Sequence, residues 1–145
     1  MSYSIGAVAE RMGLPTSTLR YYDKEGLLPD VGRTDSGLRV FDEGDLQSLR
    51  MIECLKKSGL SIKDIKQFMD WCQEGDATIE KRRAMFYERR RAVQQEMDQL
   101  QHTLDVIEYK CWFYDTAVEK GSTEAVRSIP SEELPPRMRR LKEEL

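Results

Sequence analysis

The feature that most constrains this fold is the stretch at residues 79–118, which contains neither glycine nor proline. It predicts one continuous helix, and at about 1.5 Å per residue a helix of roughly 40 residues is about 60 Å long. After Phe86 its apolar residues recur at alternating spacings of four and three, the heptad pattern of a coiled coil. We call these residues the seam: Val93, Met97, Leu100, Leu104, Ile107, Cys111, Tyr114 and Val118.

A seam of this length needs a partner. The chain has only 145 residues, and a helix of about 60 Å that packed back on its own domain would bury only part of such a stripe. We therefore expect a second copy of the chain to cover the seam, in a homodimer held together by a coiled coil.

The first quarter of the chain predicts two short helices separated by a tight turn. An apolar stripe over residues 5–12 ends at Gly13, and a second helix is expected from Thr16 to Lys24 with Leu19 and Tyr22 facing inward. Helical pairs are common, so the spacing alone leaves a DNA-binding unit and an ordinary helical pair equally open. The outward side chains of the second helix suit a major groove: Ser17, Arg20, Tyr21 and Lys24.

Residues 31–41 break the helical period and predict a small hairpin. The turn sequence Asp35-Ser36-Gly37 separates two short β-prone runs. Arg33 and Arg39 lie on the two arms, so we expect them to project as a basic tip. A hairpin in this position is a wing that reaches phosphates or the adjacent groove, and the alternative is a connecting hairpin with solvated arginines.

Two further helices are expected at 43–57 and 62–73, separated by Gly59. Each begins with the spacing of a capping box, as in Asp42 and Asp45. On the second of these helices an apolar stripe predicts a core face that consists of Ile62, Ile65, Met69 and Cys72.

These patterns predict a mainly α protein in three parts. A winged helix-turn-helix DNA-binding domain is expected at 1–76, a coiled-coil dimerisation helix at 77–120 and a C-terminal tail at 121–145. Prolines and mixed charges after Gly121 predict that the tail is extended or loosely docked, with one short helix near its end. We assign the tail no function.

The overall charge argues against a nucleic-acid partner. Lys and Arg number 23 against 26 Asp and Glu, a net charge of −3, so a DNA-binding assignment depends on where the charges lie. No segment is long and apolar enough for a membrane span, and the N-terminus lacks the pattern of a signal peptide. We expect a cytoplasmic protein whose three cysteines stay reduced.

Three segments within residues 3–75 resemble the MerR family of dimeric bacterial transcription regulators: IGAVAERMGLPTSTLRYYDKEGLL, GRTDSGLRVFDEGDL and LKKSGLSIKDIK. The long helix behind them is similar to the antiparallel coiled coil of that family. The resemblance implies two winged heads on an inverted repeat, inside a promoter whose spacer is too long. It also implies that an effector makes the dimer kink and untwist this DNA, which brings the promoter elements into register for RNA polymerase.

The resemblance also implies, by motif position, which residues contact double-stranded promoter DNA. Helical geometry places one of them, Tyr22, in the core as well. The negative net charge is compatible with these contacts if the acidic side chains point away from this surface. The implied residues are Ser17, Thr18 and Arg20 for bases or nearby phosphates, Tyr21, Tyr22 and Lys56 for the DNA backbone, and Arg33 and Arg39 for the wing.

Cys54 is the candidate sensor residue. Arg50 and Lys57 lie about one helical turn before and after it, and cationic neighbours stabilise the reactive thiolate. A cysteine just ahead of Gly-Leu-Ser resembles the AdhR/NmlR-type subgroup, which responds to reactive aldehydes and related thiol-reactive electrophiles. One alternative is a small buried hydrophobe, and another is a redox pair with Cys111 of the partner subunit.

No metal, cofactor or catalytic residue is expected. The single histidine, His102, lies on the polar side of the long helix, and three cysteines are too few for a four-cysteine cluster. No phosphate loop, nucleophile elbow or nucleotide fingerprint indicates an enzyme. Two other functions remain open. In the first, the protein bends DNA without any effector. In the second, it binds a small ligand non-covalently in a pocket lined by Trp71, Trp112, Phe113 and Tyr114.

Overall fold

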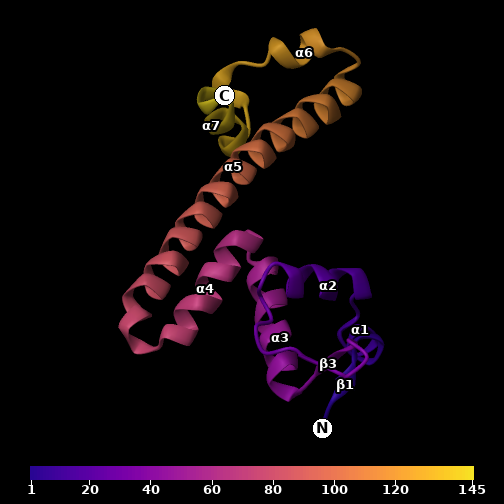
Figure 1. The fold of residues 1–145 in the computed structure, drawn as a ribbon. Helices are drawn as coiled ribbons and strands as arrows, with labels where there is room; N and C mark the ends of the chain where they lie inside the picture. Colours follow the sequence, from indigo (N-terminus) through magenta and orange to yellow (C-terminus); the bar gives the residue numbers. More distant parts are fainter. The chain divides into compact units, whose positions relative to one another are not determined.

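The computed structural model describes residues 1–145 and shows a mainly helical chain with two compact units, residues 1–89 and 90–145 (Figure 1). The boundary between the units falls inside one continuous helix, α5 (Ile79–Lys120). The first turns of α5 therefore pack with the N-terminal head, and we describe the two units separately. No helix combines the length and the apolarity that crossing a membrane would require.

The head contains four helices, a short 3-10 helix and a small sheet, in addition to the start of α5. The helices predicted over residues 5–57 are confirmed, and the helix predicted at 62–73 extends one residue further. The elements are β1 (Tyr3–Ser4), α1 (Ile5–Met12), α2 (Thr16–Lys24), β2 (Gly32–Arg33), β3 (Arg39–Phe41), α3 (Glu43–Lys57), α4 (Ile62–Glu74) and η1 (Asp76–Thr78).

Local hydrogen bonds explain where these helices begin and end. Gly13 adopts the left-handed conformation, with φ +66°, and ends α1. The Asp42 carboxylate accepts from the Asp45 N–H at 2.8 Å, and the Asp45 carboxylate accepts from the Asp42 N–H at 2.9 Å. This pair confirms the predicted capping box at α3. At α4 the Ser61 hydroxyl accepts from the Asp64 N–H at 3.1 Å.

The sheet has a third strand that the sequence does not predict. β3 pairs antiparallel with β2, as expected for the hairpin, and also with β1, so the strand order is β1-β3-β2. Tyr3 lies opposite Phe41, and Arg33 lies opposite Arg39. A strand of two residues is too short to show an alternating pattern. Its pairing nevertheless joins the wing to the residues that lead into α1.

One apolar core unites the elements of the head. Phe86 from the first turns of α5 packs edge-on against Phe68 of α4, with ring centroids 5.3 Å apart. Met85 also packs against the core. Because each fully buried side chain contributes about 1.5–3 kcal/mol, the head has enough buried residues to form a core of its own. Those without exposed surface are Val8, Leu19, Leu27, Phe41, Leu46, Leu49, Ile52 and Ile65.

The apolar stripe predicted on α4 is only partly buried. Ile65 is fully buried and Phe68, which the stripe omits, is buried as well, whereas Cys72 is exposed. The Cys72 Sγ atom lies 4.0 Å from Nη1 of Arg82. The prediction that Cys72 belongs to the core is therefore wrong. Helical spacing identifies one face of α4, but the core packed against that face ends at Met69.

The C-terminal unit contains the rest of α5 and an ordered segment after it. This segment forms α6 (Thr123–Arg127), η2 (Ser131–Glu133) and α7 (Pro136–Glu144), and it folds back along α5 (Figure 1). The expectation of an extended or loosely docked tail is wrong, whereas the short helix expected near its end is confirmed as α7. Few apolar residues of the segment are buried, and prolines separate them, so they show no periodicity that predicts a packed segment. The buried residues are Val126, Leu134 and Leu141, together with Ala117 of α5.

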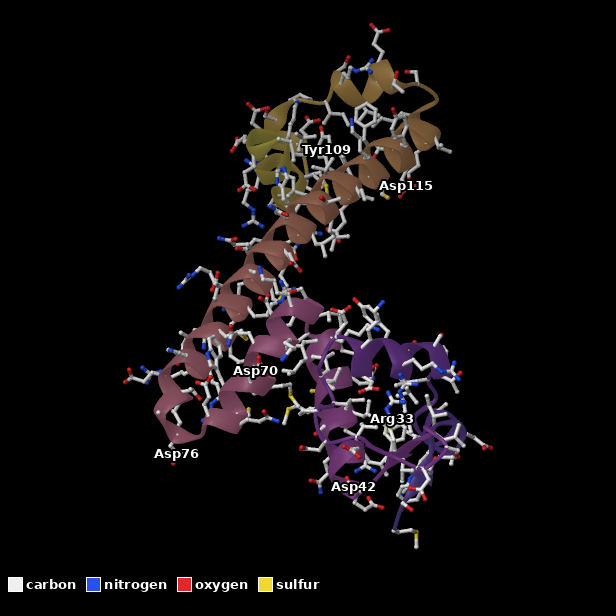
Figure 2. The ribbon with its side chains drawn as sticks, viewed as in Figure 1. Arg33, Asp42, Asp70, Asp76, Tyr109 and Asp115 are labelled. Atoms are coloured by element: carbon white, nitrogen blue, oxygen red, sulfur yellow. The ribbon has the colours of Figure 1, made fainter.

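The contacts of the folded-back segment lie on the side of α5 opposite the seam. Arg137 forms ion pairs with Asp105, at 3.9 Å, and with Glu108. The Arg127 guanidinium lies 5.7 Å from the centre of the Phe113 ring. Figure 2 shows Tyr109 on the side of α5 toward this segment. In this part of the chain α5 therefore has two apolar faces, of which its own tail covers one.

The seam itself is uncovered. Leu100 is 69% exposed and Val118 is 83% exposed. A continuous row of exposed, large apolar side chains marks an interaction surface. The other exposed members of the seam are Met97, Leu104, Ile107, Cys111 and Tyr114.

Candidate DNA-binding surface

Helix α2 buries one face and presents the other to solvent. Leu19 and Tyr22 are buried, as predicted, and Thr18 is half-buried. The Arg20 guanidinium makes one long contact of 3.5 Å, to the Thr16 hydroxyl, so it can reach beyond its own helix. A helix with short polar and basic side chains on its outer face fits a major groove. The exposed residues of that face are Ser17, Arg20, Tyr21 and Lys24.

Tyr22 belongs to the core rather than to this outer face. The residue is 1% exposed, and its hydroxyl donates to Oε1 of Glu53 at 2.6 Å. Burial, and then the bond to Glu53, raises the pKa of Tyr22 well above its ordinary value, so the hydroxyl stays protonated. This burial favours the core position that helical geometry also predicts, and a contact of Tyr22 with the DNA backbone stays a prediction. Tyr22 ties α2 to α3.

The Tyr22 hydroxyl also holds Lys56 beside α2. Its Nζ atom donates to the Tyr22 hydroxyl at 3.3 Å and lies 5.7 Å from the centre of the Tyr22 ring. The residue is nevertheless exposed, and an ammonium group has three donors. Lys56 therefore keeps donors for a phosphate, and a backbone contact from Lys56 stays a prediction.

The two wing arginines are bound to α2 rather than projecting from a tip. Nε of Arg39 lies 2.7 Å from Oδ2 of Asp23, and Nη2 of Arg33 lies 3.3 Å from the same oxygen. Figure 2 shows Arg33 between α2 and the hairpin. The Arg39 side chain is only 21% exposed, against 50% for Arg33. The expected basic tip is therefore wrong, but two guanidiniums against one carboxylate leave the group positively charged.

Two lysines that the sequence analysis omits extend this surface. Lys63 is exposed, and Lys66 donates to the Asp70 carboxylate at 2.8 Å. Basic side chains beside the outer face of α2 would add to phosphate binding. Their position just after the start of α4 is visible in the sequence, but their nearness to α2 is not. They line a recess of about 410 Å³ together with Tyr21, Glu25 and Ile62.

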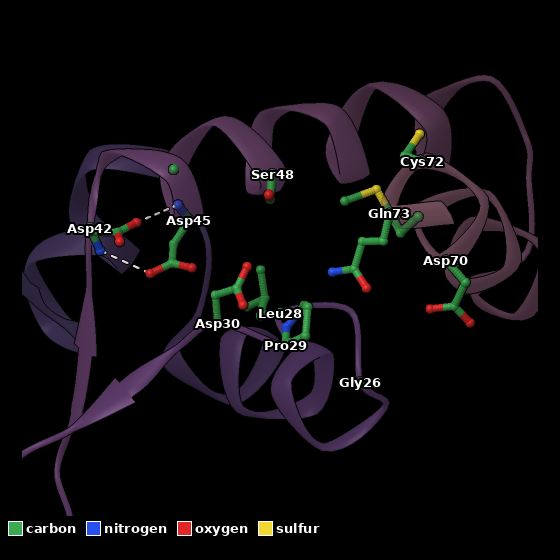
Figure 3. A pocket seen from close by; sticks show the side chains of 12 residues that line it. Gly26, Leu28, Pro29, Asp30, Asp42, Asp45, Ser48, Asp70, Cys72 and Gln73 are labelled. Atoms are coloured by element: carbon green, nitrogen blue, oxygen red, sulfur yellow. Dashed lines mark hydrogen bonds between the residues drawn. The ribbon is translucent and has the colours of Figure 1, made fainter. Parts of the chain in front are cut away.

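Acidic side chains gather at the N-terminal end of α3, the end opposite Lys56. Figure 3 shows the reciprocal bonds of Asp42 and Asp45 beside a cavity of about 380 Å³. Burial, together with the charges of Asp42 and Asp30, raises the pKa of Asp45. Lys56 and Lys57 occupy the last turn of the same helix, which at about 1.5 Å per residue is roughly 20 Å away. This separation lets an acidic chain present a basic surface.

Cys54 lies on the exposed side of α3. Its predicted cationic neighbours, Arg50 and Lys57, are exposed as well. The reading of Cys54 as a small buried hydrophobe is therefore wrong for the single chain. The Cys54 thiol is accessible to a small reagent from solvent.

An exposed helix in a helix-turn-helix, a wing beside it and basic side chains around both define a DNA-binding protein, and comparisons with known proteins name its family. The chain matches the MerR HTH family regulatory proteins over residues 3–71 and the MerR DNA-binding region over residues 46–109. An uncharacterised HTH-type transcriptional regulator of Haemophilus influenzae is 45% identical over 126 residues, which cover 87% of this chain and 93% of the relative. The regulator AdhR of Bacillus subtilis is 40% identical over 87 residues, or 60% of this chain and 62% of AdhR.

Solved structures agree with these matches. The crystal structure of HiNmlR, a MerR family regulator lacking the sensor domain, bound to promoter DNA, is similar with a TM-score of 0.65 and 45% identity, over 86% of this chain and 99% of that chain. A MerR family regulator from Bacillus thuringiensis is similar with a TM-score of 0.60 and 42% identity, over 77% of this chain and 97% of that chain. This chain belongs to the MerR family of DNA-binding transcriptional regulators, in an AdhR/NmlR-like subgroup, and its relatives are regulators rather than enzymes.

The neighbouring residues Tyr21 and Tyr22 offer a matched test of this surface. Tyr22→Phe should lower the free energy of unfolding by about 1 kcal/mol, because Glu53 and Lys56 lose their shared partner. It should change the affinity for promoter DNA by less than about threefold. Tyr21→Phe should leave stability unchanged and weaken DNA binding, as measured by urea denaturation and fluorescence anisotropy. A Tyr22→Phe protein of full stability that binds DNA poorly would show a direct contact instead.

Proposed function

We propose that this protein is a homodimeric regulator that binds an inverted repeat within an over-long promoter spacer and activates transcription by distorting the DNA. The observation that carries the proposal is the uncovered seam of α5, which follows a DNA-binding head with a complete core of its own. A second copy of the chain supplies the same seam and would cover it. Similarity to HiNmlR, which was crystallised on promoter DNA, supports the choice of target.

The order of apolar residues in α5 suits an antiparallel pair. The seam runs from Val93 to Val118 and has its midpoint between residues 105 and 106. In an antiparallel pair centred there, Leu104 faces Ile107 of the partner subunit and Leu100 faces Cys111 of the partner subunit. Apolar side chains therefore meet apolar side chains around the centre, and the two heads lie at opposite ends of one shared rod.

A rigid rod gives the dimer its proposed means of activation. Two heads joined through one coiled coil would bind both halves of an inverted repeat and deform the DNA between them. Bending or untwisting a site of this size costs on the order of 1–6 kcal/mol, which the paired contacts offset. The deformed spacer would bring the promoter elements into register for RNA polymerase, in the cytoplasm where such promoters lie.

Arg20 is the side chain on which we expect DNA recognition to depend most. Arg20→Ala should lower the affinity for the promoter fragment by at least about tenfold, because one base or phosphate contact of Arg20 is worth about 1–3 kcal/mol in each head. Arg140→Ala removes the same charge from an exposed position of α7 and is the matched control. Anisotropy titrations at fixed salt compare the two variants, and light scattering checks that both stay dimeric. Wild-type affinity in Arg20→Ala contradicts the assignment.

The seam predicts a position at which one added charge per chain would separate the proposed dimer into monomers. Leu100→Glu should give a monomer, because it places two like charges opposite apolar side chains near the middle of the pair. Loss of the second head should also weaken operator binding by about 10²–10⁴-fold. Gln95→Glu adds the same charge on the face of α5 away from the seam and should remain dimeric. Light scattering that finds Leu100→Glu still dimeric rules out this interface.

We propose Cys54 as the residue at which a thiol-reactive electrophile acts. Its thiol is exposed, and Arg50 and Lys57 flank it on the same helix. The similarity to AdhR supports this assignment. With an aldehyde, the Cys54 sulfur adds to the carbonyl carbon and the thiol proton ends on the former carbonyl oxygen. The product is a hemithioacetal, and no oxidant or reductant is needed.

Cys54→Ser separates covalent sensing from its alternatives. Transcription in vitro from the protein's own promoter should rise with methylglyoxal for the wild type and for the control Cys72→Ser, but not for Cys54→Ser. A response that persists in Cys54→Ser indicates a non-covalent ligand. Absence of a response in all three proteins indicates a DNA-bending protein without an effector. Mass spectrometry after diamide treatment tests the redox alternative, a disulfide between Cys54 and Cys111 of the partner subunit.

A further inference from the structure

We infer that Arg89 is the positioning residue that carries the chemical state of Cys54 to the dimerisation helix, an inference that rests on the proposed role of Cys54. Arg89 lies in the part of α5 that packs with the head. One helical turn further along the same helix, the seam begins at Val93. A contact made by Arg89 is therefore transmitted directly to the first residue of the dimer interface.

Arg89 is bonded to the turn that ends the helix of Cys54. The Ser58 N–H donates to the Cys54 carbonyl at 3.2 Å, which makes Ser58 the C-cap of α3. The Ser58 carbonyl accepts from Nε of Arg89 at 2.7 Å. Two hydrogen bonds, both made by the backbone of Ser58, thus link Cys54 to α5.

Gly59 makes this contact possible. Its φ of +92° belongs to the left-handed region, where side chains are strained. A Cβ atom at this position would also lie 2.7 Å from Cζ of Arg89. The glycine therefore leaves the space beside the turn that the Arg89 guanidinium occupies.

Two other side chains in the first turns of α5 contact α4 or the turn after it. Phe86 packs on Phe68 of α4. Arg82 donates to the Gly75 carbonyl at 2.9 Å and to the Thr78 hydroxyl at 3.1 Å. Neither side chain makes these contacts with α3. Arg89 is distinguished from them because its bond ends on the C-cap of α3.

An adduct on Cys54 adds atoms to the last turns of α3. Any shift of the Cys54 carbonyl moves the Ser58 amide that is bonded to it, and the Ser58 carbonyl moves with the same residue. Arg89 must then follow or release its bond. Either response changes the start of the seam, so the dimer exists in two states that differ by the adduct.

The test uses the full-length dimer with Cys54 as its single thiol, in a Cys72→Ser, Cys111→Ser background. N-ethylmaleimide is the probe: the Cys54 sulfur bonds to one alkene carbon and the thiol proton ends on the adjacent carbon. Arg89→Ala is compared with Arg83→Ala, which removes the same charge from an exposed position earlier on α5. Four quantities are measured: adduct mass, dimer mass, operator affinity and the change in hydrogen exchange over residues 86–97.

We expect every protein to form the adduct and every unmodified protein to dimerise and to bind the operator. In the parent and in Arg83→Ala the adduct should change operator affinity by about 5–150-fold and should alter exchange over residues 86–97. In Arg89→Ala both changes should fall to within about twofold of the unmodified protein. A merely structural role of Arg89 would not remove the effect of the adduct while sparing unmodified binding.

Two results overturn the inference. One is an Arg89→Ala protein that responds to the adduct like its parent. The other is an Arg89→Ala protein that fails to dimerise or to bind the operator before modification, which would make Arg89 a structural residue. Failure of the proposed function looks different, because the parent itself then forms the adduct without any response.

Discussion

The uncovered apolar seam of α5 is the constraint on which the rest of this protein depends. The head buries its own core, so nothing in the head requires a second copy of the chain. The seam does, because each large apolar side chain left in water forgoes about 1.5–3 kcal/mol, and the folded-back tail occupies the other side of the helix. The proposed dimer, the spacing of its two heads and the proposed deformation of DNA all depend on covering that seam.

The DNA-binding surface depends on a second arrangement, the separation of charge along α3. Carboxylates cap the beginning of this helix and lysines occupy its end, so an acidic chain still offers phosphates a basic face. Internal pairs then place the side chains around it. Asp23 holds both wing arginines against α2, while Tyr22 connects α2 to α3.

Much of the head could be predicted because its signals are local. The capping pair Asp42 and Asp45 and the stop at Gly13 act within four residues, so they mark helix ends directly. The errors concern contacts between segments far apart in the chain. The partner of Arg39 is an aspartate of α2, and the burial of Cys72 depends on where the core beside α4 ends. No spacing within one segment encodes either contact.

The sequence by itself determined the helices, the wing, the family and the apolar seam of α5, because periodicity, capping and motif order are properties of neighbouring residues. Only the tertiary structure decided which side chains remain available: it exposed Cys72, bound Arg33 and Arg39 to one carboxylate, and folded the tail along α5. It also placed Arg89 against the turn that ends the helix of Cys54. The physical reason is that burial and ion pairing depend on packing between segments, which residue order constrains only through the whole fold.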